Sequence, residues 1–525
     1  MIPSGAVFFI LISAVLLAAA LAWVVAALYQ RGMLALMRGG VPPATAMTGG
    51  NQSTLNLAAH HEPVTAAETN KADLGTNRHA SVRLMLVLSG ISLLIALTQS
   101  YLALFFIYQE GELSLNRVLL LGAIYAWPMV LAWGLARRWS WLRVLGGVIL
   151  YMLVMLVLVM ARSTEAQNLA SASGWLGSQV AIPMTIIFLI GASGRIRAVA
   201  PYLLAPSVLL TGSSVLTLQV MAQSAHNPAP WVIGLVGTLG AYPTLLLFAL
   251  GPWLILAWPV FSFGKWLANA YRSKRFSDLI YLIATYWFVI LFASALPAME
   301  SVGWLAFVQV PALLWIPLVL FCLRGHLKPR LSPPTLLVLR VFQRDAQVER
   351  LFDQVIERWR LSGNTVLIAG TDLLSRTLDP DDLFVYLNGT LAERFIANPA
   401  QIGERIAGFD WQPDPDGRYR INECYCFDST WQSALHALVA RADVVLMDLR
   451  GFRMENRGCR YELGVLAGDS RLRRIVVLYD RDTARTEAES DIDAAAAGRF
   501  EWLSADQMDS AMTDRVLSAL FSDKV

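Results

Sequence analysis

Apolar stretches of about 20 residues or longer dominate the first 324 residues. The bilayer core is about 30 Å thick and a helix rises about 1.5 Å per residue, so each such stretch predicts a membrane-spanning helix. We find nine, none with a charged residue or His in its interior, over residues 5–29, 84–108, 118–136, 143–161, 176–194, 198–222, 231–263, 279–298 and 303–323. The stretch 231–263 is too long for one straight span, and it contains the helix breakers Gly240, Pro243, Gly251 and Pro252.

The connections between these stretches alternate between rich and poor in Lys and Arg. The richer connections are expected on the cytoplasmic side. Nine crossings then place the N-terminus outside and residues 325–525 in the cytoplasm, in a plasma membrane of the bacterial inner-membrane type. The connection 39–82 is rich in Gly, Pro, Ala, Thr and Asn and has no periodicity, which is typical of a disordered cytoplasmic linker.

Composition and charge agree with a division into residues 1–324 and 325–525. The chain is 56% hydrophobic and only 15% charged. The first part holds 17 of the 42 basic and 8 of the 39 acidic residues, so the excess of base lies in its apolar region and the second part is acidic. We therefore expect a lipid bilayer as partner and no nucleic acid. Four cysteines indicate no secreted disulfide framework.

The apolar spans themselves suggest little chemistry. Charges inside a bilayer mark ion and proton pathways, and their absence argues against a proton-coupled transporter. Thr98, Gln99, Gln219 and Gln309 are neutral polar residues of the kind that form hydrogen bonds between helices. A membrane anchor, a sensor of the membrane and a transporter of a neutral solute remain as alternatives.

Short apolar runs alternate with amphipathic helices in residues 325–525. We expect strands at 336–342, 365–369, 442–448 and 473–479, and helices at 346–361, 381–396, 429–441, 457–468 and 510–521. Apolar strands separated by helices indicate a parallel sheet covered on both faces. The predicted fold class is therefore a multi-pass helical membrane bundle followed by a flavodoxin-like α/β domain.

Ligands bind beyond the carboxyl ends of the strands in such sheets. Arg344 and Asp345 follow the first predicted strand, Asp372 follows the second, and Asp448 and Arg450 come at the end of the 442–448 strand. These five residues are predicted to shape a ligand pocket. Neither a GxGxxG motif after a strand nor a GxxxxGK[ST] motif is present, so neither a dinucleotide fingerprint nor a P-loop supports the site.

The segment 443–449 (Asp-Val-Val-Leu-Met-Asp-Leu), a short loop and then Cys459-x-x-Glu462-Leu463 resemble the Toll/interleukin-1 receptor (TIR) family. The same pattern also resembles nucleoside deoxyribosyltransferases and related TIR-like nucleotide-binding domains. The resemblance covers about 445–480 and, more loosely, 336–372. Gly458 stands where the family usually has Trp, the preceding loop lacks Ser, and residues 373–425 have no counterpart.

Both families cleave N-glycosidic bonds, and the resemblance implies NAD or a related nucleotide as substrate. The position of Glu462 matches the essential glutamate of catalytic TIR domains, where a carboxylate stabilises the ribosyl cation that develops as the base leaves. Two other interpretations stay open for Glu462: nucleotide binding without turnover, and a structural role, either as a charge at the helix N-terminus or in a salt bridge to Arg460 or Arg473.

Two other motifs allow either a structural or a ligand-binding interpretation. The pair Cys424-x-Cys426 lacks a standard zinc spacing and fits alternation along a strand better, so no metal is expected. Arg418, Arg420 and Asn422 have the chemistry to bind a phosphate, but a solvated loop is the default expectation.

The leading hypothesis is a membrane-anchored signalling or defence-type effector whose TIR-like domain binds NAD or a related nucleotide, with hydrolysis left open. A non-catalytic sensor or scaffold that binds a nucleotide or self-associates is the alternative. A neutral-solute transporter with a regulatory domain is a lesser one. No cofactor is expected, and a homo-oligomer is a possible assembly.

Overall fold

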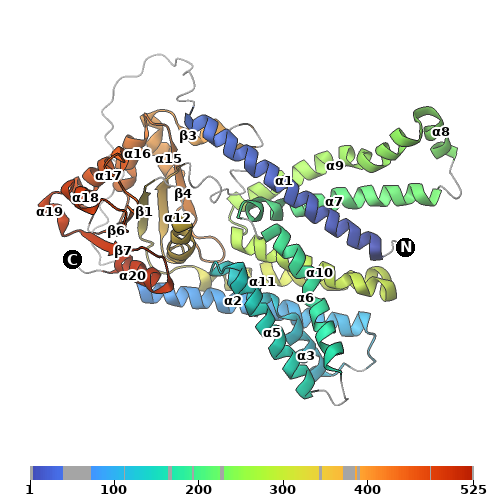
Figure 1. Cartoon of the computed structure of the whole chain (residues 1–525). Coiled ribbons are helices and arrows are strands. Elements are labelled where there is room, and N and C mark those ends of the chain that lie inside the picture. The colour runs from blue at the N-terminus through green and yellow to red at the C-terminus, as the bar shows by residue number, and fades with distance from the viewer. Residues whose placement is uncertain are drawn as a thin grey trace. The chain divides into compact units, whose positions relative to one another are not determined.

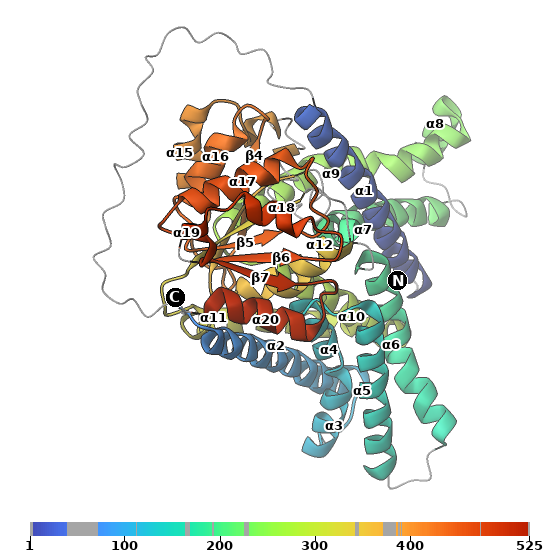
Figure 2. The same ribbon diagram turned by 60° about the vertical axis from the view of Figure 1, so that its left-hand side comes forward.

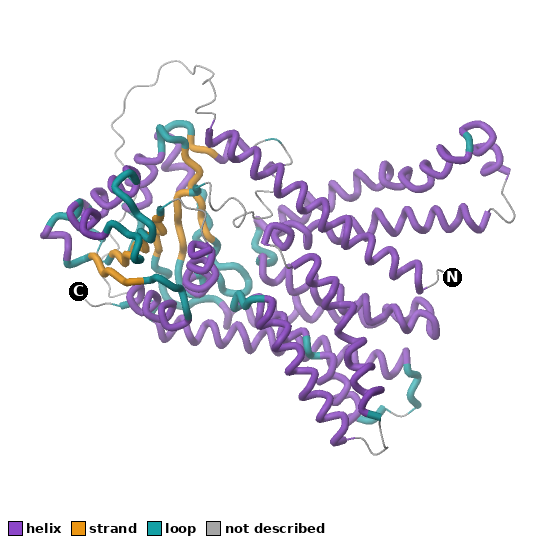
Figure 3. The backbone as a smooth tube through the Cα atoms, viewed as in Figure 1, coloured by secondary structure: helices purple, strands orange, loops and turns teal. Residues whose placement is uncertain are grey.

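The computed structural model describes residues 4–38, 72–111, 113–162, 168–191, 194–224, 230–341, 346–370, 385–386, 389, 391–472 and 474–522. They form two compact units. The first contains the described residues of 4–29 and 87–319, and the second contains those of 30–86 and from 320 onward. Figure 3 shows that the strands lie together in one part of the chain, whereas the rest is helical.

Nine helices among the described residues are long and apolar enough to cross a membrane. Each overlaps one of the predicted stretches, so the prediction of a multi-pass membrane protein is confirmed (Figure 1). Three of the nine spans join two consecutive elements each, α2 with η1, α3 with α4, and η2 with α11, and the short helix α8 is not one of the nine. The elements of this part of the chain are α1 (Ser4–Arg38), α2 (Leu74–Leu102), η1 (Ala103–Ile107), α3 (Leu115–Tyr125), α4 (Pro128–Ala136), α5 (Trp141–Arg162), α6 (Leu169–Gly191), α7 (Gly194–Ser224), α8 (Pro230–Leu239), α9 (Ala241–Arg272), α10 (Asp278–Val302), η2 (Gly303–Leu314) and α11 (Trp315–Leu327).

The long stretch 231–263 is broken at Gly240, as the sequence predicts. Gly240 has a φ of 88°, which separates α8 from α9. Helix α8 has 10 residues and spans only about 15 Å at the rise of an α-helix, so α9 supplies the membrane crossing. Pro252 lies inside α9.

Neutral polar residues join helices within the membrane unit. The Gln99 side-chain amide donates to Ser294 Oγ at 3.1 Å, and Trp315 Nε1 donates to Thr98 Oγ1 at 2.8 Å. The Gln309 amide donates to the carbonyl oxygen of Leu291 at 3.4 Å. Such bonds satisfy groups that lipid cannot, and they confirm the expectation for three of the four residues.

The remaining predicted position, Gln219, differs. Its buried Oε1 has no hydrogen-bond partner among the described residues. Helix α7, which carries Gln219, is instead joined to α9 by Ser214 and Thr217, whose hydroxyls donate to the carbonyl oxygens of Ala249 and Phe248.

The second unit is built on a seven-stranded, all-parallel sheet. The strand order is β3-β4-β2-β1-β5-β6-β7, and five of these strands, β2-β1-β5-β6-β7, have the flavodoxin-like arrangement that was predicted. The strands are β1 (Thr335–Arg340), β2 (Asn364–Ile368), β3 (Phe395–Ile396), β4 (Ile421–Cys426), β5 (Val444–Asp448), β6 (Ile475–Tyr479) and β7 (Phe500–Ser504).

Helices cover both faces of the sheet, as Figure 2 shows. Alternate residues of β1 belong to two different cores: Leu337 and Leu339 pack in one, and Leu336 and Val338 in the other. One face is covered by α15 (Ile402–Ala407), which follows the short helix η5 (Pro399–Gln401), and by α16 (Trp431–Val439), α17 (Arg457–Gly468), α18 (Arg485–Ser490) and α19 (Ala494–Ala497). The other face is covered by α12 (Ala346–Leu351), η3 (Phe352–Ile356), α13 (Glu357–Trp359) and α20 (Ser510–Phe521).

Some predicted elements differ from the structure. The helix expected at 381–396 is replaced, over its described C-terminal part, by η4 (Leu391–Arg394) and strand β3. Phe395 pairs with Tyr425 of β4, so tertiary pairing overrides the local helical pattern. Strand β7 was missed because its burial alternates with exposed Glu501 and Ser504, without the continuous apolar run of the central strands.

The linker expected at 39–82 lies outside the described residues as far as residue 71. Helix α2 begins inside its last part, at Leu74, after Asp73, whose Oδ1 accepts from the Thr76 N–H at 2.7 Å. The Asn77 amide donates to Ser362 Oγ at 2.8 Å and to the Arg358 carbonyl at 2.7 Å. The start of α2 is therefore part of the α/β unit.

Arg418 and Arg420 lie in a buried ion-pair network, so the expectation of a solvated loop is wrong. Arg418 Nε lies 2.9 Å from Asp416 Oδ2, and Arg420 Nη2 lies 2.8 Å from Asp414 Oδ1. Arg418 also reaches Glu357 at 3.2 Å. Carboxylates that are close in the sequence but face inward provide the countercharge, because a buried charge must be paired.

We predict that Gly417→Ala destabilises the α/β unit. Gly417 has a φ of 84°, and an added Cβ would lie 2.3 Å from the Leu327 carbonyl oxygen. Both the backbone strain and the clash should lower the melting temperature of the full-length protein in detergent, by the equivalent of about 1–3 kcal/mol. Gly403→Ala is the control, since its Cβ would meet nothing within 4 Å in helix α15. Equal melting temperatures for the two variants would contradict this prediction.

Candidate functional site

The direction of strand addition reverses between β1 and β5. From β1 the chain adds β2 on one side, and it later returns to place β5 on the other side. In open α/β sheets, the crevice at the carboxyl ends of two such strands is the usual ligand site. The residues predicted from the sequence to bind a ligand are therefore expected near the carboxyl ends of β1 and β5.

Two charged residues end the strands at this place. Arg340 is the last residue of β1 and Asp448 the last of β5, and the two are register partners. Both are buried. The Arg340 guanidinium lies over the Phe352 ring, 5.8 Å from its centroid. Arg340 was not among the predicted site residues, although a single charge in the run Leu-Leu-Val-Leu-Arg-Val was a signal that could have found it.

Asp448 is bound in a local ion pair with Arg450. Arg450 Nε and Nη2 lie 2.8 Å and 2.6 Å from the two carboxylate oxygens, and the Arg450 backbone N–H donates to Oδ1 at 3.2 Å. Both side chains are buried. This bidentate geometry holds the carboxylate firmly, so the pair acts as one neutral element beside Arg340.

Glu462 is buried in the second turn of α17. Its exposed fraction is 4%, and Oε2 has no hydrogen-bond partner among the described residues. Burial raises the pKa of Glu462 from 4.5 to about 8, and the positive charge of Arg340 partly opposes this rise. A carboxyl group of this kind is mostly protonated at neutral pH.

Cys459 lies one helical turn before Glu462 and links it to the strand ends. Its Sγ is 4.0 Å from the Arg340 carbonyl oxygen. Burial raises the pKa of the Cys459 thiol, and the neighbouring charges of Glu462 and Asp448 raise it further. A thiol with a raised pKa is a poor nucleophile, so Cys459 serves here as a packing residue.

The structure thus brings together Asp448, Arg450 and Glu462 of the six predicted site residues. The other three, Arg344, Asp345 and Asp372, lie outside the described residues. Neither alternative salt bridge of Glu462 is present among the described residues: Arg460 pairs with Asp491 at 2.7 Å, and Arg473 is not described.

The loop after β5 is tied to the loop after β6 by Asp480. Its Oδ1 accepts from the Gly451 N–H at 3.0 Å and from Thr483 Oγ1 at 2.7 Å. Gly451 has a φ of 71°, which lets the chain turn directly after the Asp448–Arg450 pair. Asp480, which positions this edge, was not among the predicted residues, because nothing in the local sequence distinguishes it from a solvated turn residue.

The cysteine pair lies elsewhere on the sheet. Cys424 and Cys426 are on β4, as their alternating pattern predicts, with their sulfur atoms 3.6 Å apart. No group of three or more His, Cys, Asp or Glu side chains suited to a metal ion occurs in the described part of the chain.

Comparisons of this chain with protein-family models, with curated proteins and with solved structures find no match. The site is therefore defined by its own geometry, and the TIR-like identity stays a resemblance of sequence pattern.

The buried carboxyl group predicts a pH-dependent stability. The folded protein keeps the Glu462 proton up to a pH of about 8, whereas the unfolded chain releases it near 4.5. Stability should therefore fall as pH rises between these values, by about 1.4 kcal/mol per pH unit at most, and Glu462→Gln should remove this contribution. Thermal unfolding of the full-length protein in detergent should be measured at pH 5, 6.5 and 8. The melting temperature of Glu462→Gln relative to that of the wild type should increase from each pH to the next. Glu455→Gln, at an exposed position of the preceding loop, is the control; a parallel course of wild type and Glu462→Gln would refute the prediction.

Proposed function

We propose that this protein is a membrane-anchored effector whose α/β domain binds NAD or a related nucleotide and hydrolyses its N-glycosidic bond. The observation that carries the proposal is the buried Glu462 oxygen, which has no hydrogen-bond partner among the described residues. It lies near the carboxyl ends of β1 and β5, where the direction of strand addition reverses. A buried carboxyl group without a described partner is costly, and such groups gather at functional sites. The resemblance of Cys459-x-x-Glu462-Leu463 to catalytic TIR domains supports the same position.

The chemistry follows from charge development. In NAD hydrolysis the bond between ribose C1′ and the nicotinamide nitrogen breaks, and its electron pair neutralises the pyridinium ring. The ribosyl cation is captured by water, which loses a proton to the solvent. Glu462, as a carboxylate in a low-dielectric site, would stabilise that cation. Arg340 and the Asp448–Arg450 pair would hold the group next to it, and Arg344, Asp345 and Asp372 are proposed to complete the pocket.

The membrane part would anchor the domain at the inner side of the plasma membrane. This orientation rests on the distribution of Lys and Arg in the connections. Within this proposal, the stimulus would reach the domain through the helices that enter it: α2 packs on the α/β unit through Asn77, and α11 leads directly into β1.

The test measures nicotinamide release from NAD by the full-length protein in lipid nanodiscs. We expect turnover by the wild type, a loss of at least about 100-fold in Glu462→Gln, and no change in Glu455→Gln. Because the carboxylate is the active form, kcat/KM should rise with pH, reach half of its maximum near pH 8 and level off above that pH.

Binding of NAD, measured by isothermal titration, separates the alternatives. Binding that depends on Glu462 without nicotinamide release would favour the non-catalytic sensor or scaffold. The absence of both binding and release would overturn the proposal.

A further inference from the structure

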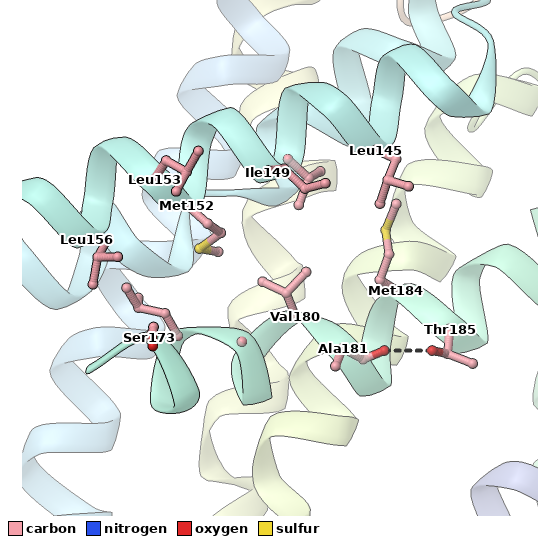
Figure 4. Close-up of a pocket in the computed structure, with 13 residues that line it drawn as sticks. Leu145, Ile149, Met152, Leu153, Leu156, Ser173, Val180, Ala181, Met184 and Thr185 are labelled. Carbon is pink, nitrogen blue, oxygen red and sulfur yellow. Dashed lines mark hydrogen bonds between the residues drawn. The ribbon is translucent and has the colours of Figure 1, made fainter. Parts of the chain in front are cut away.

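A hollow of about 430 Å³ lies between α5 and α6 of the membrane unit. Figure 4 shows that side chains of both helices line it, among them Leu145 and Ile149 of α5 and Met184 of α6. The lining hydroxyls of Ser173 and Thr185 donate to carbonyl oxygens of their own helix, so the hollow presents hydrocarbon to an occupant. Both helices are long and apolar enough to span a membrane, and lipid chains are sufficient to fill such a space. The cysteine pair of β4, in the α/β unit, offers a more specific chemistry.

Cys424 and Cys426 lie side by side on one face of β4. Side chains two residues apart on a strand point to the same face, and the two sulfur atoms are 3.6 Å apart. Both thiols are free. Tyr425, between them in the sequence, points to the opposite face, and its hydroxyl donates to the Glu423 carboxylate at 2.6 Å. The two thiols therefore meet each other, with no other side chain of the strand between them.

The two thiols differ in their access to solvent. Cys424 is fully buried in the core of the sheet, whereas Cys426 is half-buried and is the last residue of β4. The edge strand β3, which has only two residues, pairs with β4 and places Ile396 as the register partner of Cys426. The hydrogen bond to Cys424 and burial raise the pKa of the Cys426 thiol, which protects it from oxidation in the closed sheet. Local opening of the short β3 strand removes that protection, so an oxidant reaches Cys426 first and Cys424 is placed to react with the product.

The backbone of β4 holds the two residues further apart than a disulfide prefers. Cα atoms two residues apart on a strand are separated by about 6.4–6.8 Å, whereas disulfides most often join Cα atoms about 5.5–6 Å apart. A disulfide here would draw the two residues together and distort β4. The distortion would reach both neighbouring strands, because the Cys424 carbonyl oxygen accepts from the Ala369 N–H at 2.9 Å after β2, and Phe395 of β3 is the register partner of Tyr425. Strained disulfides of this kind are readily reduced, and they are the regulatory ones.

We propose that Cys424 and Cys426 are a reversible redox-modification site, at which hydrogen peroxide converts the two thiols into a disulfide within β4. The Cys426 thiolate attacks a peroxide oxygen, the O–O bond breaks, and Cys426 becomes a sulfenic acid while the leaving hydroxide takes up the proton lost by the thiol. The Cys424 thiolate then attacks the Cys426 sulfur, the S–O bond breaks, and a second water forms in the same way. Two thiols are thereby oxidised by two electrons, and one peroxide is reduced to two waters. The domain is proposed to lie in the cytoplasm, where disulfides are usually transient and redox-sensing. This site is independent of the nucleotide chemistry proposed for Glu462.

Peptide mass spectrometry of the full-length protein in detergent tests the disulfide. The reduced protein is treated with hydrogen peroxide, its remaining thiols are alkylated after denaturation, and trypsin then places both cysteines in the peptide 421–441. We expect this peptide to lose the mass of two hydrogen atoms and to resist alkylation until dithiothreitol is added. In Cys424→Ser the reaction should stop at the sulfenic acid of Cys426, which dimedone traps, whereas the control Cys322→Ser, on α11, should still form the disulfide. A wild-type peptide that stays fully alkylated, or that carries only sulfinic and sulfonic acids, would overturn the proposal.

Amide hydrogen exchange of the same protein tests the effect on the sheet. We expect the amides of β3 and β4 to exchange several-fold faster after oxidation, and those of β5 to keep their rates, because β2 and β1 separate β5 from β4. Reduced glutathione should restore the original rates. Cys424→Ser/Cys426→Ser, whose folding is verified by thermal unfolding, should show no change on oxidation. Unchanged exchange of β3 and β4 after full conversion to the disulfide, or a disulfide that glutathione leaves intact, would refute a reversible switch at this strand.

Discussion

The pairing of β1 with β5 is the constraint on which the α/β unit depends. The two strands are register partners from Leu336 and Val444 to Arg340 and Asp448. They come from segments more than 100 residues apart, so this parallel pairing closes a long loop and needs continuous apolar cores on both faces to offset the entropy lost. Once it forms, it determines where the carboxyl ends meet, and α17 then delivers Glu462 to the same place.

Buried charges differ between the amino ends and the carboxyl ends of the strands. Near the start of β4, Arg418 and Arg420 form ion pairs with carboxylates, and this network holds a loop in place. Near the carboxyl ends of β1 and β5, Glu462 is also buried but has an oxygen with no partner in the described part of the chain. The first arrangement is what folding stability requires. The second is unfavourable for stability, and this cost is the physical basis for expecting a ligand there.

The sequence predicts the apolar framework well, because burial in lipid or in a doubly covered sheet leaves continuous hydrophobic runs. Helices α17 and α20 and the central strands appear where those runs lie. It fails where long-range pairing decides: β3 and β7 are stabilised by their neighbours, and Arg418 and Arg420 look like loop residues until their carboxylate partners are in place. In the site, Glu462 carries a recognisable motif, whereas Arg340 and Asp480 acquire their positions only from the tertiary fold.

The closed pair of Asp448 and Arg450 has a consequence for how the crevice would attract a ligand. With that pair neutral and Glu462 protonated, the charged side chains that remain at the strand ends include Arg340 on β1 and Asp480 after β6. The field that a phosphate-bearing molecule would meet there therefore depends on the protonation of Glu462. Loss of the Glu462 proton would add a negative charge, so a carboxylate that would stabilise a cationic sugar would also repel the phosphates of the same molecule.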